Sequence, residues 1–408
     1  MGPQPSTGFA SLLRNRRFVL WLASGFCGGL GYAAWSISVL WLAYQITGNL
    51  VVTALVLSVQ YVIYAVTFIA GPFIDRVADK RWVYLFVYPI EAATLVVVGL
   101  AIRSGSLTIV LLLSAVVVTA LLDDFWWTAE NTVPPMLVEK EGLLVANGLM
   151  TASGGGSSIA GYSIGAVLLI IVGPSGGAFL FALLLVAATL LIAPVALRSA
   201  TTSERRLLSN FLEGWSFLGR GEGRPLLQLG AVLAAEGLFL AAPPLLITSF
   251  SNRLFSNPSE TYGILFTAYV VGILVGGLAI GQANPKRHIG TLLVGAVALQ
   301  AAGLALALLF VPTTSLDAAA WFVVGVATSV PSTIIYAFLQ GTTPSETLGR
   351  AVSNLYIFPG IASAVGAVGF GALSTVLPPL SFGYAIVLGL LLAGAAIASV
   401  PFVWRLRF

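Results

Sequence analysis

Long hydrophobic blocks alternate with short polar segments along almost the whole chain. Each block is close to the roughly 20 residues that cross a hydrocarbon core as a helix. None shows the roughly 10-residue alternation of a membrane barrel strand. The pattern therefore predicts an all-α membrane protein with 12 transmembrane helices. These are expected at residues 18–46, 50–72, 82–102, 106–127, 145–172, 176–197, 226–250, 261–281, 289–311, 317–340, 351–376 and 380–404.

The basic residues predict the orientation of these helices. If the N-terminus is inside, the outer segments hold only Arg103 and Arg253 of the 19 Lys and Arg residues. Short cytoplasmic loops carry an excess of Lys and Arg. We therefore expect an integral protein of the cell (inner) membrane with both termini in the cytoplasm.

The longest inner segment, residues 198–225, separates six predicted helices from six. Its apolar residues recur at spacings of three and four, which predicts an amphipathic helix on the cytoplasmic face that links the halves. The predicted domains are thus an N-terminal bundle at 1–197, this linker, and a C-terminal bundle at 226–408. Similar segments around Asn147 and Asn354 follow the fourth and tenth helices, which indicates two pseudo-symmetric bundles of six helices. Repeated bundles of this kind place a substrate site near the bilayer midplane.

The composition excludes several other classes of protein. Charged residues make up 8% of the chain, against roughly 25% in soluble proteins. The basic residues are dispersed, which argues against nucleic-acid binding. Cys27 and His288 are the only cysteine and histidine, too few for a metal site of Cys and His ligands. Gly154-Gly155-Gly156 follows no strand, so it predicts close helix packing rather than a nucleotide loop. We expect no enzyme activity and no cofactor, with protons as the coupling ion.

Several short motifs carry a resemblance to a known family. The run Gly71-x-x-x-Asp75-Arg76, with Lys80-Arg81, is similar to the loop signature of the major facilitator superfamily. Other motifs resemble the branch of enterobactin exporters and macrolide efflux pumps, so that the resemblance covers nearly the whole chain. They are Leu13-Arg14-Asn15-Arg16-Arg17-Phe18, Thr47-Gly48-Asn49, Pro135-Met136-Leu137-Val138, Glu213-Gly214-Trp215 and Gly349-Arg350.

The resemblance implies the major facilitator fold, with helices one, four, seven and ten around a central cavity. It also implies a gating loop, in which Asp75 ties the two halves together on the cytoplasmic side by meeting the start of helix eleven near Arg350. The residues expected in this gate are Gly71, Asp75, Arg76, Lys80, Arg81 and Arg350.

Acidic residues inside the predicted spans are the candidate proton-coupling groups. A charge near the bilayer centre costs at least about 2.5 kcal/mol, so such residues usually have a function. Glu236 and Glu91 lie roughly 15 and 14 Å from the inner face, and Asp123 and Asp124 roughly 25 Å from the outer face, at 1.5 Å per residue. Together with the resemblance, these depths rank Glu236 first, one of the two aspartates second and Glu91 third. Glu130 is expected to be an exposed residue beyond the inner membrane edge.

The predicted spans contain no Lys or Arg. Anionic solutes bound at the midplane are usually met by cations or helix N-termini, so a cavity with acids alone suits neutral or cationic solutes. Aromatic side chains at similar depths are candidates for stacking on a substrate or binding a cation. These are Tyr32, Trp35, Trp126 and Trp127.

These patterns predict a proton-coupled secondary transporter that exports small hydrophobic neutral or cationic compounds, of the drug or metabolite type, by alternating access. One alternative is an importer or uniporter of a neutral nutrient in the same fold. Another is a non-transporting membrane receptor or scaffold, which would need a soluble signalling region that the sequence does not show. The expected partners are the lipid bilayer and a small-molecule substrate, with no obligate protein partner evident.

Overall fold

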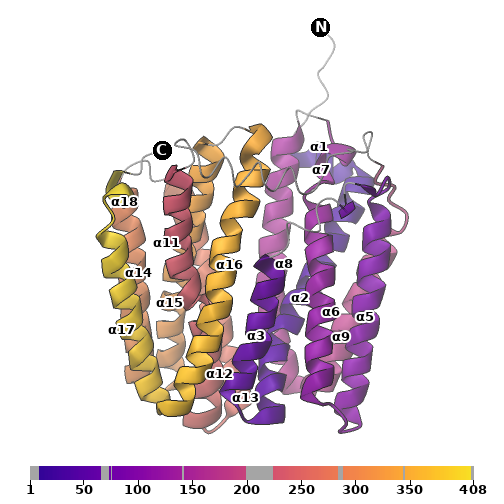
Figure 1. Ribbon diagram of the computed structural model, residues 1–408. Helices are drawn as coiled ribbons and strands as arrows, with labels where there is room; N and C mark the ends of the chain where they lie inside the picture. The colour runs from indigo at the N-terminus through magenta and orange to yellow at the C-terminus, as the bar shows by residue number, and fades with distance from the viewer. Residues whose placement is uncertain are drawn as a thin grey trace. The chain divides into compact units, whose positions relative to one another are not determined.

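The computed structural model describes residues 9–65, 73–74, 76–139, 142–198, 224–283, 288–342 and 345–405, nearly all of them helical. The helices, labelled in Figure 1, are α1 (Phe9–Arg14), α2 (Arg16–Thr47), α3 (Leu50–Ala65), α5 (Arg81–Arg103), α6 (Ile109–Glu130), α7 (Pro134–Leu137), α8 (Leu143–Ile171), α9 (Gly173–Ile192), α11 (Arg224–Leu240), α12 (Ala242–Leu254), α13 (Pro258–Ala283), α14 (Ile289–Phe310), α15 (Thr314–Thr342), α16 (Ser345–Val376), α17 (Pro379–Ala398) and α18 (Pro401–Arg405). The predicted linker at 198–225 lies almost wholly outside the described residues.

Ten spans within the described residues are long and apolar enough to cross a membrane. Helices α3 and α8 occupy the positions of the second and fifth predicted spans, so the predicted all-α membrane class is confirmed. The seventh span is interrupted at Ala241, where α11 gives way to α12. Pro243 and Pro244 follow at once, and proline is favoured in the first turn of a helix because it has no N–H to lose.

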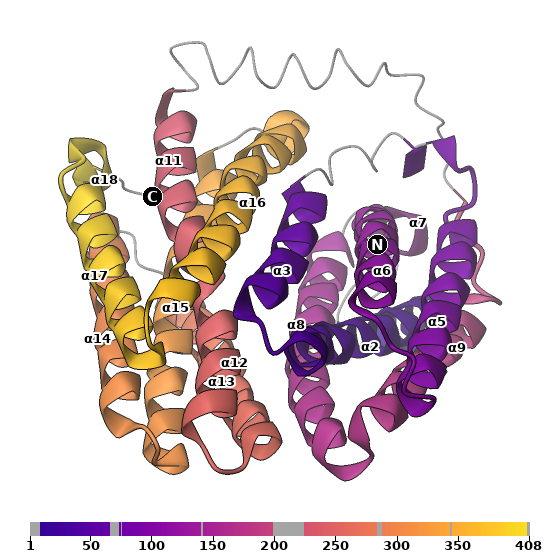
Figure 2. The same cartoon turned by 60° about the horizontal axis from the view of Figure 1, so that its bottom comes forward.

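The chain forms two compact units. Unit 1 contains residues Met1–Val39 and Ile69–Arg205, and unit 2 contains Leu40–Phe68 and Arg206–Phe408. In unit 1, α5 packs against both α6 and α9, and α8 packs against α9 (Figure 2). In unit 2, α13 packs along α15, α14 contacts α15 and α17, and α11 lies along α16.

Helix α3 packs along α16 within unit 2. The division at 1–197 and 226–408 assigned α3 to the first bundle and did not anticipate this packing. Two glycines of α16 allow the close approach. A Cβ atom on Gly371 would lie 2.6 Å from Ala54 Cβ, and one on Gly360 would lie 2.7 Å from Ala65 Cβ.

The close helix packing predicted for the Gly154–Gly156 run occurs further along α8. In the described part of the chain, nothing lies within 4 Å of a Cβ built on Gly154 or Gly155. A Cβ on Gly161 would instead lie 2.5 Å from the Leu30 carbonyl oxygen, and one on Gly165 would lie 2.8 Å from Ala34 Cα. A Cβ on Gly156 would lie 3.7 Å from the ring of Phe26 of α2, an ordinary contact distance. The prediction of close packing is therefore wrong for Gly154 and Gly155, and the second half of α8 is the part that packs closely on α2.

Candidate functional site

Two acidic side chains of unit 1 lie within its helices and interact with each other. Glu91 is near the middle of α5 and Asp123 is in the second half of α6. Glu91 is 5% exposed, and its Oε1 atom accepts no hydrogen bond from a described residue. Its carboxyl group interacts electrostatically with that of Asp123. The structure thus brings together two acids that the sequence analysis singled out separately.

Asp123 and Asp124 have different surroundings. Asp124 is 6% exposed, whereas Asp123 keeps partial exposure. Asp123 also interacts electrostatically with Tyr32 of α2 and Tyr162 of α8. Asp123 is therefore the member of the pair that joins Glu91 and the two tyrosines.

The four predicted aromatic residues lie in unlike environments. Tyr32 is partly exposed and lies beside the acidic pair. Trp35 is 2% exposed, and its Nε1 donates a hydrogen bond to Thr119 Oγ1 at 3.1 Å. The rings of Trp126 and Trp127 have centroids 6.3 Å apart, and Trp127 is largely exposed. Trp35 therefore fastens α2 to α6, and Tyr32 is the predicted aromatic residue that accompanies the acids.

Glu130 is buried, and the expectation that it would be exposed is wrong. It is the last residue of α6 and is 6% exposed. Its Oε2 atom accepts hydrogen bonds from Tyr84 Oη at 2.5 Å and Trp21 Nε1 at 3.0 Å. Because Tyr84 is near the start of α5 and Trp21 is near the start of α2, three helices meet at this carboxylate. The sequence signal for this buried acid was the presence of Trp21 and Tyr84, two hydrogen-bond donors at similar depth near the starts of their helices.

Glu236 is the predicted acid that unit 2 contains. It lies on α11, about one turn before the interruption at Ala241. Its carboxyl group keeps partial exposure and makes no hydrogen bond or ion pair within the described residues. The neighbouring backbone is held firmly, since Ser363 Oγ of α16 donates a hydrogen bond to the Gly237 carbonyl at 2.8 Å. A Cβ atom on Gly237 would lie 2.7 Å from Pro359 Cα. The helix backbone is therefore held in place, while Glu236 has no partner among the described residues.

Among the described residues, no ion pair with a basic side chain is found for Glu91, Asp123 or Glu236. The ion pair found there joins Arg81 and Asp79, with a distance of 3.4 Å between Nη2 and Oδ2. Arg103 and Arg253 lie in the last turns of α5 and α12. The prediction of a cavity with acids and without bases stays a prediction.

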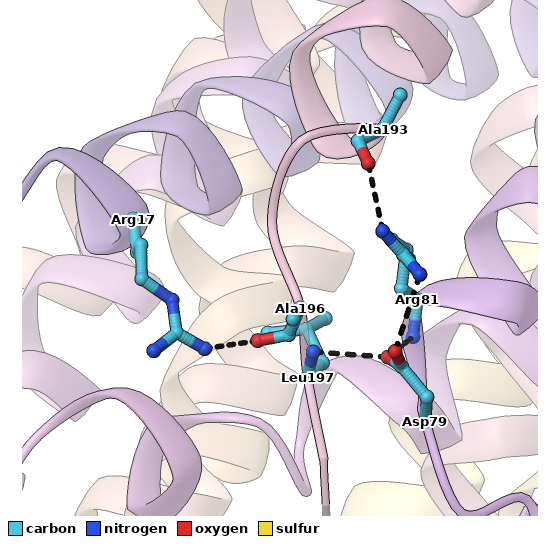
Figure 3. A network of polar contacts seen from close by, with 6 residues as sticks. All are labelled: Arg17, Asp79, Arg81, Ala193, Ala196 and Leu197. Carbon is cyan, nitrogen blue, oxygen red and sulfur yellow. Dashed lines mark hydrogen bonds and ion pairs between the residues drawn. The ribbon is translucent and has the colours of Figure 1, made fainter.

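The loop before α5 is bonded to the segment after α9 (Figure 3). Asp79 Oδ1 accepts hydrogen bonds from the backbone N–H of Leu197 at 2.9 Å and of Arg81 at 3.1 Å. Arg81 Nη1 donates to the Ala193 carbonyl at 3.1 Å, and Arg17 Nη2 donates to the Ala196 carbonyl. These bonds join the ends of α2, α5 and α9 within unit 1.

The predicted gating residues are only partly described. Lys80 Nζ donates a hydrogen bond to the Ile74 carbonyl, and Arg76 is exposed. With Arg81 bound to Asp79, the described bonds of Lys80 and Arg81 lie within unit 1. Gly71, Asp75 and the side chain of Arg350 lie outside the described residues, so their role in a gate stays a prediction.

Asp317 is a buried acid that the sequence analysis did not consider. It lies in the first turn of α15 and is fully buried, with Trp321 one turn further along the helix. Asp317 is the first residue of the tenth predicted span, at its outer end, where a charged residue in contact with water is common. An acid is favourable in the first turn of a helix because the N-terminus carries a partial positive charge. Neither carboxyl oxygen of Asp317 accepts a hydrogen bond from a described residue.

No group of three or more His, Cys, Asp and Glu side chains suited to a metal ion occurs among the described residues.

Solved structures show which fold this arrangement belongs to. Neither a protein-family model nor a curated protein sequence matches the chain. A crystal structure of the nucleoside transporter NupG is similar, with a TM-score of 0.71, 14% identity and coverage of 94% of this chain and 99% of that one. A POT family transporter in complex with 5-aminolevulinic acid has a TM-score of 0.73 at 10% identity, with coverage of 96% and 97%. A bacterial homologue of the human lysosomal transporter Spinster, inward-facing and unoccupied, has a TM-score of 0.67 at 13% identity, with coverage of 96% of each chain. The chain therefore adopts the major facilitator fold that the sequence predicted.

Proposed function

We propose that this protein is a secondary active membrane transporter, coupled to protons, that exports small hydrophobic neutral or cationic compounds by alternating access. The likeness to transporter structures over almost the whole chain supports a transporter. Proton coupling is inferred from the acids themselves, and export from the resemblance of the sequence motifs to exporters and efflux pumps.

The interacting pair of Glu91 and Asp123 carries the proposal. Two carboxylates that share a nonpolar site repel each other when both are ionised, and a proton on one of them removes that repulsion. No described Lys or Arg lies beside the pair to compensate the charge. A site of this kind binds and releases protons as its access to water changes, which is what a proton-coupled carrier requires.

Glu236 supplies the corresponding group in unit 2. Its carboxyl group is partly exposed and has no partner among the described residues, and it lies just before the interruption of its span at Ala241. A helix break inside a membrane span is common at binding sites of transporters, because the freed backbone groups line a cavity. We assign Glu236 the role of coupling proton movement to the change between the inward-open and outward-open conformations.

The substrate class follows from the charges. Acids without bases favour neutral and cationic solutes, and Tyr32 beside Asp123 offers an aromatic face to a cation. A nutrient importer or uniporter is the second candidate, since the similar structures include a nucleoside transporter and a POT family transporter bound to 5-aminolevulinic acid.

Replacing Glu236 by glutamine tests the coupling role. Glu236→Gln keeps the shape of the side chain but removes its ionisable group, so the protein should fold while proton-driven transport is abolished. The measurement is uptake of ethidium or tetraphenylphosphonium into inverted membrane vesicles under an imposed pH gradient. Glu260→Gln, at an exposed acid of α13, is the matched control and should behave as wild type.

Driven uptake by Glu236→Gln at the wild-type rate would rule out this assignment. Accumulation of neutral nucleosides in right-side-out vesicles, without any movement of the two cations, would favour the second candidate instead of export.

A further inference from the structure

One face of α5 carries three buried polar groups over two helical turns. Tyr84, Tyr88 and Glu91 are spaced by four and three residues, and all three are at most 5% exposed. Residues with this spacing lie on the same side of a helix. The face extends over about 10 Å, from the first turn of α5 to its middle.

Helix α6 presents carboxyl groups to both ends of this face. Tyr84 meets Glu130 through a hydrogen bond of 2.5 Å, and Glu91 meets Asp123 through an electrostatic interaction. Going from Tyr84 to Glu91 advances seven residues along α5, and going from Glu130 to Asp123 moves back seven along α6. The two antiparallel helices therefore keep the same register over two turns, with a tyrosine bonded to an acid near the start of α5 and two acids that interact in mid-span.

Tyr88 lies between the two pairs. Its ring centroid is 5.9 Å from that of Tyr84, and its hydroxyl group is 3.5 Å from the Ser24 carbonyl oxygen. It interacts electrostatically with both Glu130 and Glu91. The Tyr88 side chain thus lies between the two carboxyl sites, and among the described residues its hydroxyl group donates to the Ser24 carbonyl.

Helix α2 leaves space for these groups. A Cβ atom on Gly25 would lie 2.6 Å from Glu130 Oε1, and one on Gly28 would lie 2.6 Å from Tyr88 Oη. The two glycines are three residues apart and so face the same side of α2. Any larger residue at either position would displace the carboxylate or the hydroxyl.

The described basic side chains of α2 and α5 that are named below bind groups other than Glu130, and the further charged groups on α6 are acidic. Arg17 of α2 binds the Ala196 carbonyl, and Arg81 of α5 binds Asp79 and the Ala193 carbonyl. On α6, Asp124 is a further acid beside Asp123. Among the described side chains, Glu130 has hydrogen bonds from Trp21 and Tyr84 but no basic partner.

We propose that Glu130 is a second proton-binding site, which exchanges protons with the Glu91–Asp123 pair by way of Tyr84 and Tyr88. The inference rests on the proposed proton coupling and adds a route for the proton. In this step the Tyr88 hydroxyl releases the Ser24 carbonyl, accepts the proton that leaves the central pair and passes its own proton to the Tyr84 hydroxyl. Tyr84 in turn passes its proton to the Glu130 carboxylate. Glu130 then loses a proton to water at the end of the unit where α2 and α5 begin. Each carboxyl group alternates between its protonated and ionised forms, so that charge and protons balance over a cycle. The orientation predicted from the basic residues puts that end on the cytoplasmic side.

Infrared spectroscopy of the full-length protein in lipid tests the proposal without any substrate. The carbonyl stretch of protonated carboxyl groups is followed while the pH is varied. Glu130→Gln keeps an acceptor for Tyr84 and Trp21, and we expect the loss of one titrating component from the spectrum. Glu139→Gln, at an exposed acid, is the matched control and should not change the buried components. An unchanged spectrum in Glu130→Gln would overturn the proposal and leave Glu130 as a purely structural acceptor.

The connection between the two sites is tested with Asp123→Asn. Asp123 lies seven residues from Glu130, or about 10 Å along α6. Removal of its negative charge makes ionisation of Glu130 easier, so the midpoint of the Glu130 component should move to lower pH. An unmoved midpoint would overturn the connection. If Glu130→Gln does not fold, Tyr84→Phe replaces it, because the loss of this hydrogen bond should shift the frequency of the Glu130 component. A spectrum insensitive to Tyr84→Phe would equally refute the assignment.

A transport measurement separates this proposal from the function on which it rests. Tyr88→Phe keeps the ring and removes the hydroxyl group, so proton-driven uptake of ethidium should slow at least about tenfold, a change of about 1.4 kcal/mol in the barrier, while unfolding temperature stays the same. Uptake at the wild-type rate would exclude the route through Tyr88. If wild type itself shows no proton-driven uptake, the proposed function fails, and with it the route, whatever the spectra show for Glu130.

Discussion

At the scale of single residues, the decisive feature is which polar group each acid meets. Asp123 and Asp124 are adjacent, yet a helix turns them about 100° apart. Asp123 meets Glu91 and Tyr32, whereas Asp124 is buried on another side of α6. An ionised group away from water is costly, and Asp123 can share a proton with the Glu91 carboxyl group. Neutralising Asp123 should therefore affect proton exchange more than neutralising Asp124.

A matched pair of substitutions measures this difference. Asp123→Asn should abolish proton-driven uptake of tetraphenylphosphonium, because the pair with Glu91 can no longer share a proton. Asp124→Asn, with the same change of charge and size one residue away, should have a weaker effect or none. Equal loss of transport in both variants would contradict the assignment of Asp123 as the exchanging residue.

At the scale of helices, glycine positions decide which elements approach closely. Helices α13 and α15 cross where a Cβ on Gly272 would overlap the Phe322 carbonyl oxygen, and a Cβ on Gly325 would overlap that of Tyr269. Small residues at such crossings let membrane helices gain contacts that larger ones prevent. The obstacles here are backbone atoms, which cannot move aside as a side chain can.

Gly272→Ala should therefore destabilise unit 2. Overpacking of this kind costs about 1–3 kcal/mol, and the expected result is a lower unfolding temperature of the purified protein. Gly295→Ala on α14 is the control, since nothing described lies within 4 Å of its Cβ. That substitution should be neutral or stabilise by up to about 1 kcal/mol through helix propensity. Equal unfolding temperatures for the two variants would contradict the close crossing.

At the scale of the whole molecule, the distribution of basic residues predicts the topology. Cys27 is the only cysteine, so a Cys27→Ala background allows single cysteines to be placed at will. Ser104→Cys and Ser256→Cys lie at exposed positions of predicted outer segments, and Ala78→Cys lies at an exposed position of a predicted inner one. A membrane-impermeant maleimide added to intact cells should label the first two and not the third. Labelling of Ala78→Cys alone would invert the predicted orientation.

The sequence by itself determined the membrane class, the helical fold and the positions of most spans. These features depend on hydrophobic length and on backbone hydrogen bonds that a helix satisfies within itself. The same local logic identified Glu236, Asp123 and Glu91, because an acid in an apolar run is conspicuous wherever it lies in the fold.

Only the tertiary structure decided which of these groups meet. That α3 lies along α16, that Asp123 and not Asp124 faces Glu91, and that Glu130 is buried against Trp21 all depend on contacts between residues far apart in the chain. Glycines govern several of these contacts, since a missing side chain shows its effect only when its neighbour is known. Helix periodicity predicts which residues share a face of one helix. Packing between helices determines which other helix that face meets. The row of polar groups between Glu130 and Asp123 is therefore visible only in the folded unit.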